Sequence, residues 1–187
     1  LIVEPKTVFY NLLKRGKLLL PGEDVEGEMY ELIMEEMEKH GFFQYEISNY
    51  AKPGYECRHN MVYWNNEEYF GFGAGAHGYL GDVRRANINP VNKYIQTIEE
   101  GHMPVREEIR LTEKEKMEEE MFLGLRKNTG VSIETFMKKY QIDPLEKYKD
   151  VIPRLEGQKL IEVTEDSIRL TKKGRMLGNE VFAEFID

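Results

Sequence analysis

Apolar residues recur at helical spacing in the first third of the chain. One face of a helix is formed by Val25, Met29, Leu32, Ile33 and Met37. A shorter helix is expected between Thr7, a suitable N-cap, and Gly16, and Gly41 closes the longer one. The apolar runs at residues 1–5 and 42–48 predict strands. Because strands and helices alternate, this half favours a parallel sheet with crossover connections.

The middle of the chain loses this periodicity. Residues 48–68 follow neither the helical nor the strand period, which predicts a long loop, and such loops are more often functional than idle. Residues 69–79 are predicted to form a strand that runs into a glycine-rich end. A short helix over 89–101 and a linker over 102–110 follow.

Helical capping signals dominate from Leu111 onward. A capping box in "TEKE" opens one helix, and a serine and an aspartate open two more; Pro153 is expected to kink the third. A hairpin is predicted over 159–171 and a closing helix over 172–186. Three helices, a hairpin and a helix form the winged-helix pattern. We therefore expect two domains, residues 1–108 and 109–187. The three caps are Thr112, Ser132 and Asp143.

Composition narrows the class of protein. With 187 residues, 41% of them apolar and 32% charged, the chain fits a soluble protein with a core, and no apolar run approaches the ~20 residues of a membrane span. A net charge of −8 without a basic block argues against binding nucleic acid. The single cysteine excludes an internal disulfide and fits a cytoplasmic protein. Because the chain opens on Leu1 within an apparent strand, we expect a fragment of a longer protein.

Two readings of the glycine-rich "GFGAGAHG" remain open. The string is not GxGxxG followed by a clear helix, which argues against a dinucleotide site. Glycines at a strand end serve tight packing in most proteins. Alternatively, Gly73 to His77 line the mouth of a barrel, where the ends of the strands carry the active site.

Cys57 and His59 are candidate ligands. A structural zinc site needs four ligands, and the other histidines are too scattered to complete one, so a buried cysteine and a hydrogen-bonded loop histidine are the plainer reading. The surrounding side chains favour another reading, because an imidazole among ring faces suits axial ligation and stacking of a macrocycle such as heme. These aromatic residues are Tyr55, Tyr63, Trp64, Tyr69 and Phe70.

For the expected winged-helix region, we favour a structural or partner-docking role. Acidic residues outnumber basic ones over 111–187. The predicted third helix, "PLEKYKDVIPRLEG", has mixed charge and a proline, and it lacks the basic stripe of a recognition helix. DNA binding is therefore disfavoured.

The central string "YEISNYAKPGYECRHNMVYWNNEEYFGFGAGAH" resembles the HemW group of the radical S-adenosylmethionine proteins, relatives of the oxygen-independent coproporphyrinogen III oxidase. His59, Asn60, Tyr63 and Trp64 match the HNxxYW string that marks HemW rather than the oxidase. "FLGLRKNTGV" and "RLTKKGRMLGNEVFAEF" are similar to the C-terminal domain of this group. The resemblance covers essentially the whole chain.

This resemblance implies an α/β fold, in which the C-terminal part of a partial (β/α) radical SAM barrel precedes a small winged-helix-like α+β domain. The CxxxCxxC motif that binds the family's [4Fe-4S] cluster is absent here, and Cys57 is not one of its cysteines. The chain alone should then be catalytically silent, without a catalytic residue or a metal site of its own.

The resemblance also implies site residues and partners. His59 becomes the candidate heme ligand, with Cys57 as the competing ligand and Tyr63 and Trp64 as stacking walls. The residues beside S-adenosylmethionine would be Gly73, Ala74, Gly75, Ala76 and His77. The implied function is binding heme and delivering it to acceptor hemoproteins; the alternative is an oxidase-like enzyme of porphyrin biosynthesis that decarboxylates propionates. Membrane contact would be peripheral and through a partner, and the oligomeric state stays open.

Overall fold

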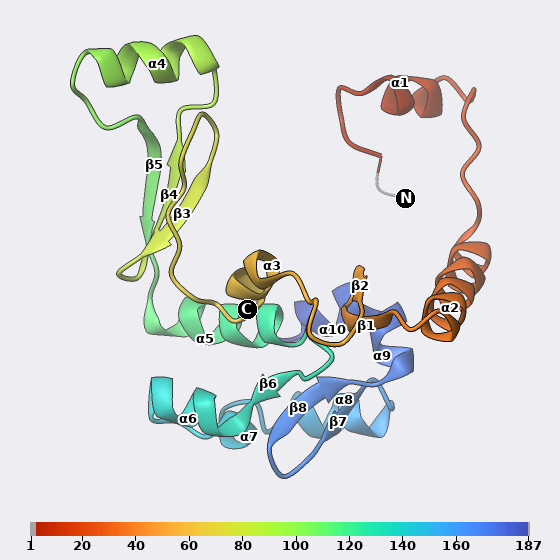
Figure 1. Ribbon diagram of the computed structural model, residues 1–187. Helices are drawn as coiled ribbons and strands as arrows, with labels where there is room; N and C mark the ends of the chain where they lie inside the picture. The colour runs from red at the N-terminus through yellow and green to blue at the C-terminus, as the bar shows by residue number, and fades with distance from the viewer. Residues whose placement is uncertain (1–2, 187) are drawn as a thin grey trace. The chain divides into compact units, whose positions relative to one another are not determined.

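The computed structural model describes residues 3–186 and divides into two compact units, residues 1–40 and 41–187 (Figure 1). The first unit holds two helices, as predicted. The side chain of Thr7 accepts the backbone N–H of Tyr10 at 3.1 Å, and Gly16 follows with a φ of 65°. The strand expected over 1–5 lies partly outside the described residues, and Val3 and Glu4 are not in a strand. The helices are α1 (Val8–Lys14) and α2 (Glu23–Lys39).

Antiparallel hairpins replace the parallel sheet that the alternating pattern predicted. Every strand pair within residues 3–186 is antiparallel, and tight turns join some of the neighbouring strands. Gly81 and Asp82, which join β3 to β4, have φ values of 54° and 64°, as two-residue hairpin loops require. The strands are β1 (Phe43–Glu46), β2 (Asn49–Ala51), β3 (His77–Leu80), β4 (Val83–Asn87) and β5 (Val105–Arg110).

Three expectations for the middle of the chain need correction. Residues 48–68 are not one loop, because they contain β2 and the helix α3 (Arg58–Trp64). The predicted linker over 102–110 contains β5, which completes a sheet in the order β3-β4-β5. Most of 69–79 is irregular, and only its end enters β3. The expected helix is present as α4 (Val91–Glu99), at the far end of that sheet in Figure 1.

The C-terminal region follows its capping signals closely. The capping box of Thr112 and Glu115, and the caps Ser132 and Asp143, all form. Pro153 does not kink a helix; it lies in the first turn of a new one, since proline is tolerated there. The elements are α5 (Glu113–Gly124), β6 (Val131–Ser132), α6 (Ile133–Tyr140), α7 (Pro144–Lys147), α8 (Ile152–Gly157), β7 (Ile161–Val163), β8 (Ser167–Leu170), α9 (Lys172–Met176) and α10 (Gly178–Ala183).

The main hydrophobic core lies in this C-terminal region. Side chains from α5, α6, α8, α10 and the β6-β8-β7 sheet meet there, and Met121, Leu125 and Phe136 are fully buried. The chain approaches close to itself at Gly174, where an added Cβ would lie 1.8 Å from the carbonyl oxygen of Leu160. The predicted closing helix is divided into α9 and α10 at Leu177.

The lengths and apolar content of the described helices show whether any of them could span a membrane. Within residues 3–186, none is both long enough and apolar enough to cross a bilayer.

Candidate functional site

His59 and Tyr63 lie one turn apart on α3, the helix that contains the HNxxYW residues. The spacing i, i+4 brings side chains together on one helix face. The Nε2 atom of His59 is 3.1 Å from the Tyr63 hydroxyl, and the two rings meet edge to face with centroids 4.9 Å apart. His59 is exposed and Tyr63 is half-buried. The helix therefore presents an imidazole whose orientation is fixed by a phenol.

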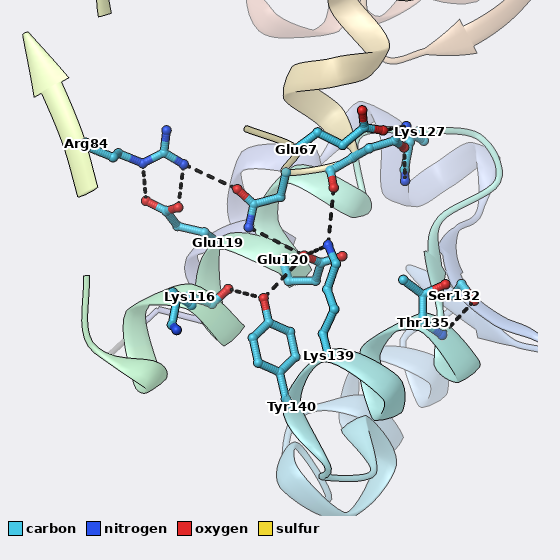
Figure 2. A network of polar contacts seen from close by, with 12 residues as sticks. Glu67, Arg84, Lys116, Glu119, Glu120, Lys127, Ser132, Thr135, Lys139 and Tyr140 are labelled. Carbon is cyan, nitrogen blue, oxygen red and sulfur yellow. Dashed lines mark hydrogen bonds and ion pairs between the residues drawn. The ribbon is translucent and has the colours of Figure 1, made fainter. Parts of the chain in front are cut away.

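The aromatic row extends from Tyr63 into the protein. The rings of Tyr63 and Tyr69 are 4.5 Å apart, and Arg84 donates from Nη1 to the Tyr69 hydroxyl at 3.4 Å. Arg84 in turn donates from Nε and Nη2 to the carboxylate of Glu119 in α5 (Figure 2). Burial raises the pKa of Tyr69. Burial alone would lower the pKa of Arg84, but its hydrogen bonds and ion pair with Glu119 outweigh this and leave the pKa raised. The row thus ends on a neutral phenol and a permanently charged guanidinium.

Trp64 contacts a different set of residues from Tyr63. The Arg126 guanidinium lies over its indole, 4.4 Å from the ring centroid, and Arg126 directly follows the C-cap of α5. An Arg126 amino nitrogen is 3.7 Å from the carboxylate of Glu46, which is fully buried. The indole Nε1 is buried and has no hydrogen-bond partner within residues 3–186. Tyr63 is thus packed beside His59, whereas Trp64 is packed against the C-terminal region.

The residues that follow α3 are held by lysines of the C-terminal domain. Lys127 donates to the side-chain oxygen of Asn65 at 2.8 Å, and burial lowers the pKa of this lysine. Lys139 donates to Glu120 at 2.9 Å and to the Asn65 carbonyl at 3.4 Å, and Asn66 donates to Glu120 at 3.4 Å. Figure 2 shows this network gathered around Glu120. The end of α3 is therefore fixed by charged partners.

The glycine-rich segment is a turn whose polar groups bond within the chain. Gly73 and Gly75 have φ values of 103° and 71°, which strongly favour glycine. The Asn87 amide donates to the carbonyls of Gly71 and Gly73 at 3.1 and 2.9 Å. Ala74 and Ala76 lie in the same segment, and the exposed His77 begins β3. Internal packing accounts for these glycines, and their place beside S-adenosylmethionine stays a prediction.

Cys57 and His59 do not share a helix face. Cys57 is exposed and precedes α3 as its N-cap, without a side-chain cap. Residues two apart on a helix point in different directions. In the part of the chain that the structure describes, no group of three histidine, cysteine, aspartate or glutamate side chains is arranged to hold a metal ion.

Sequence reasoning missed Arg84, Arg126 and Glu120, which connect this site to the rest of the chain. Contacts such as those of Arg84 with Glu119, 35 positions apart, and of Asn66 with Glu120, 54 apart, depend on the tertiary fold, so no local pattern marks them. One signal was present, because Arg126 stands in the string "FLGLRKNTGV" that carried part of the resemblance.

Comparison with known structures supports the fold. The coproporphyrinogen III oxidase HemN from Escherichia coli, described as a radical SAM enzyme, matches with a TM-score of 0.71 at 17% identity. The match covers 92% of this chain and 44% of the oxidase. At this identity the likeness shows a shared mixed α/β fold over part of that enzyme.

Comparison with known sequences identifies the family. Residues 111–177 match the HemN C-terminal domain. The protein named heme chaperone HemW from Bacillus subtilis (strain 168) is 53% identical over 188 residues, which is 100% of this chain and 49% of that protein. Its namesake from Lactococcus lactis subsp. lactis (strain IL1403) is 45% identical over 100% of this chain and 48% of its own length. The chain spans about half the length of these curated relatives. Because the identity extends over all of its residues, the chain belongs to the HemW family.

Proposed function

We propose that this chain is part of a heme chaperone, in which α3 presents His59 as a ligand to heme iron. The family relationship supports a heme chaperone, because two relatives of that name match the whole chain. The observation that carries the assignment to His59 is its contact with Tyr63 at 3.1 Å. In metal sites, the second ring nitrogen of a ligating histidine is held by a neighbouring group.

The contact with Tyr63 indicates which nitrogen would bind iron. With Nε2 held by the Tyr63 hydroxyl, Nδ1 is the ring nitrogen available for ligation. Heme is the cargo here, and its porphyrin would lie against apolar ring surface. Tyr63 supplies such a surface directly beside the imidazole. Trp64 remains the second proposed wall through the part of its ring that Arg126 leaves uncovered, and Cys57 remains the competing ligand.

The wider parts of the proposal concern the whole protein. Gly73 to His77 would border S-adenosylmethionine, and a [4Fe-4S] cluster would be ligated by residues other than those of this chain. The chain contains one cysteine and cannot by itself supply three thiolates. We further propose a cytoplasmic protein that delivers heme to acceptor hemoproteins and does not bind nucleic acid.

The test is a heme titration followed by absorbance, using His59→Ala, Cys57→Ser and the control His102→Ala. His59→Ala removes the ligand and leaves the ring of Tyr63 in place. We expect a changed Soret band and affinity about tenfold weaker, the range seen when metal-site contacts are lost. His102, an exposed residue outside α3, should behave as the parent.

The same titration separates the alternatives. Because heme adheres to many apolar surfaces, binding alone does not support the proposal. A loss confined to Cys57→Ser would transfer the ligand role to the thiolate. If His59→Ala keeps the parent Soret position and affinity, the assignment of His59 is wrong.

A further inference from the structure

Arg126 lies between two aromatic side chains from different parts of the chain. Its guanidinium carbon is 4.4 Å from the centroid of Trp64 and 6.0 Å from that of Phe182 in α10. A guanidinium within about 6 Å of a ring face is attracted by the ring quadrupole, most strongly for tryptophan and when both are shielded from water. Arg126 therefore joins the end of α3 to the core of the C-terminal domain.

The ion pair of Arg126 with Glu46 lacks a hydrogen bond. Its amino nitrogen is 3.7 Å from Glu46, which is too far for a hydrogen bond. The other carboxylate oxygen of Glu46 accepts the backbone N–H of Ser48 at 3.0 Å and the side-chain amide of Asn49. Arg126 Nε has no hydrogen-bond partner within residues 3–186. Ring contact and the charge of Glu46, rather than a hydrogen bond, thus hold the guanidinium.

The neighbours of Arg126 in sequence hold the same region. The Arg126 carbonyl accepts the backbone N–H of Ile47 at 3.1 Å, and the Asn128 backbone N–H donates to the Tyr45 carbonyl at 3.1 Å. Lys127 holds Asn65, the residue directly after α3. We name residues 126–128 the clamp. It fixes the end of β1 and the end of α3 to one another.

Trp64 is well placed to set the rotation of α3. It follows His59 by five positions, and at about 100° per residue the two side chains point roughly 140° apart around the helix. The side of α3 that contacts the C-terminal domain is thus well separated from the side that presents the imidazole. A shift of Trp64 would rotate a helix of only 7 residues and carry His59 with it.

We propose that Arg126 is a positioning residue for heme ligation: by holding Trp64, it sets the direction in which α3 presents His59. The C-terminal domain then contributes to heme binding without contacting heme. This inference rests on the proposed function, since it assigns a role to Arg126 in the same site.

The experiment has a readout that needs no heme. Trp64 is the only tryptophan of the 187-residue chain, so its fluorescence reports on this contact alone. We would compare Arg126→Met, which keeps a long side chain without charge, and Arg126→Lys, which keeps the charge without the planar group. The control is Arg154→Met, an exposed arginine of the same domain paired with Glu184.

Arg126→Met should shift the Trp64 emission to the red and increase its quenching by acrylamide. Its heme affinity should fall about tenfold with an altered Soret band, as when a group that orients a ligand is lost. Arg126→Lys should give smaller changes in both, and Arg154→Met none. Far-UV circular dichroism identifies a variant that fails to fold, in which case Arg126→Lys carries the test.

Two results would overturn the inference. If Arg126→Met leaves Trp64 emission and quenching as in the parent, Arg126 does not hold the indole. If the emission changes but the Soret band and heme affinity do not, the clamp does not position the ligand. Failure of the proposed function is a distinct result, because the parent would then show no His59-dependent Soret band; the Trp64 readout would still decide whether Arg126 holds α3.

Discussion

Different kinds of contact stabilise the C-terminal region and the α3 region. The domain has a continuous apolar core in which Met121, Leu125 and Phe136 are fully buried. α3 has no buried residue, and the loop after it exposes the large rings of Phe70 and Phe72. Its position depends on polar and ring contacts to Glu120 and to the clamp of residues 126–128.

This difference indicates that α3 takes its order from the C-terminal region. Burial of a large apolar side chain contributes about 1.5–3 kcal/mol, and the C-terminal domain has many such side chains. A charged hydrogen bond contributes about 1.5–3 kcal/mol at best, and exposed ion pairs contribute less. Substitutions in the core should therefore unfold the domain, whereas substitutions in the network should loosen α3.

The largest effect is expected for Phe136→Ala. Phe136 is fully buried between α5 and the helices that follow, and its removal leaves a cavity. We expect a loss of about 4 kcal/mol in the free energy of unfolding, measured by urea denaturation. Met137→Ala, at the exposed neighbouring position, should cost about 0.5 kcal/mol. Equal losses for the two variants would contradict the core described here.

A smaller effect is expected for Glu120→Ala. Glu120 is buried and accepts hydrogen bonds from Lys139, Asn66 and Tyr140, so its removal takes an acceptor from all three donors. Lys139 and Tyr140 keep the carbonyl oxygens of Asn65 and Lys116. We expect a loss of about 2 kcal/mol and faster amide exchange in residues 65–67. Glu162→Ala, which breaks an exposed pair with Arg169, should cost less than about 0.5 kcal/mol. Unchanged exchange in residues 65–67 would show that Glu120 does not order the end of α3.

The smallest effect is expected for Tyr140→Phe, and it depends on pH. Burial, followed by the carboxylate of Glu120, raises the pKa of Tyr140 above its usual 10.0. The unfolded chain therefore loses this proton first, so the stability from Tyr140 is complete below pH 10 and declines as the pH rises above it. Tyr140→Phe should cost about 1 kcal/mol at neutral pH, because its hydrogen bonds are lost.

Urea denaturation at two pH values checks this prediction. Between about pH 9 and pH 11 the unfolding free energy should fall less steeply in Tyr140→Phe than in the parent. Tyr69 and Tyr79, whose pKa values burial also raises, leave a residual slope in both proteins. The exposed Tyr55 supplies the control Tyr55→Phe, which should keep the parent slope. A slope as steep in Tyr140→Phe as in the parent would contradict the assignment.

The parts of the fold that sequence alone could predict are those set by neighbouring residues. The caps at Thr112, Ser132 and Asp143 were confirmed because each acts within three residues of its partner. The direction of strand pairing was wrong, because the apolar pattern of a strand does not say which strand it meets. β5 was mistaken for a linker because five of its six residues are exposed and give no alternation.

The candidate site was predicted only in its residue types. His59, Tyr63 and Trp64 were recognised, but as part of a loop, so the i, i+4 contact between His59 and Tyr63 could not be anticipated. A helix of 7 residues without a side-chain cap gives too weak a local signal to be recognised. Arg126 was not predicted, since its contact with Trp64 depends on the tertiary fold.

The distance along the chain between α3 and its anchors has a consequence for biosynthesis. Asn66 and Glu120 are 54 positions apart, and Asn65 and Lys127 are 62 apart. A ribosome adds about 5–20 residues per second, so the 62-residue interval takes roughly 3–12 s to synthesise. The HNxxYW segment is therefore made several seconds before its anchors. Closing so long a loop also carries an entropic cost that only the finished C-terminal domain can offset. A nascent chain should therefore acquire an ordered α3 only after the C-terminal region has been made and has folded.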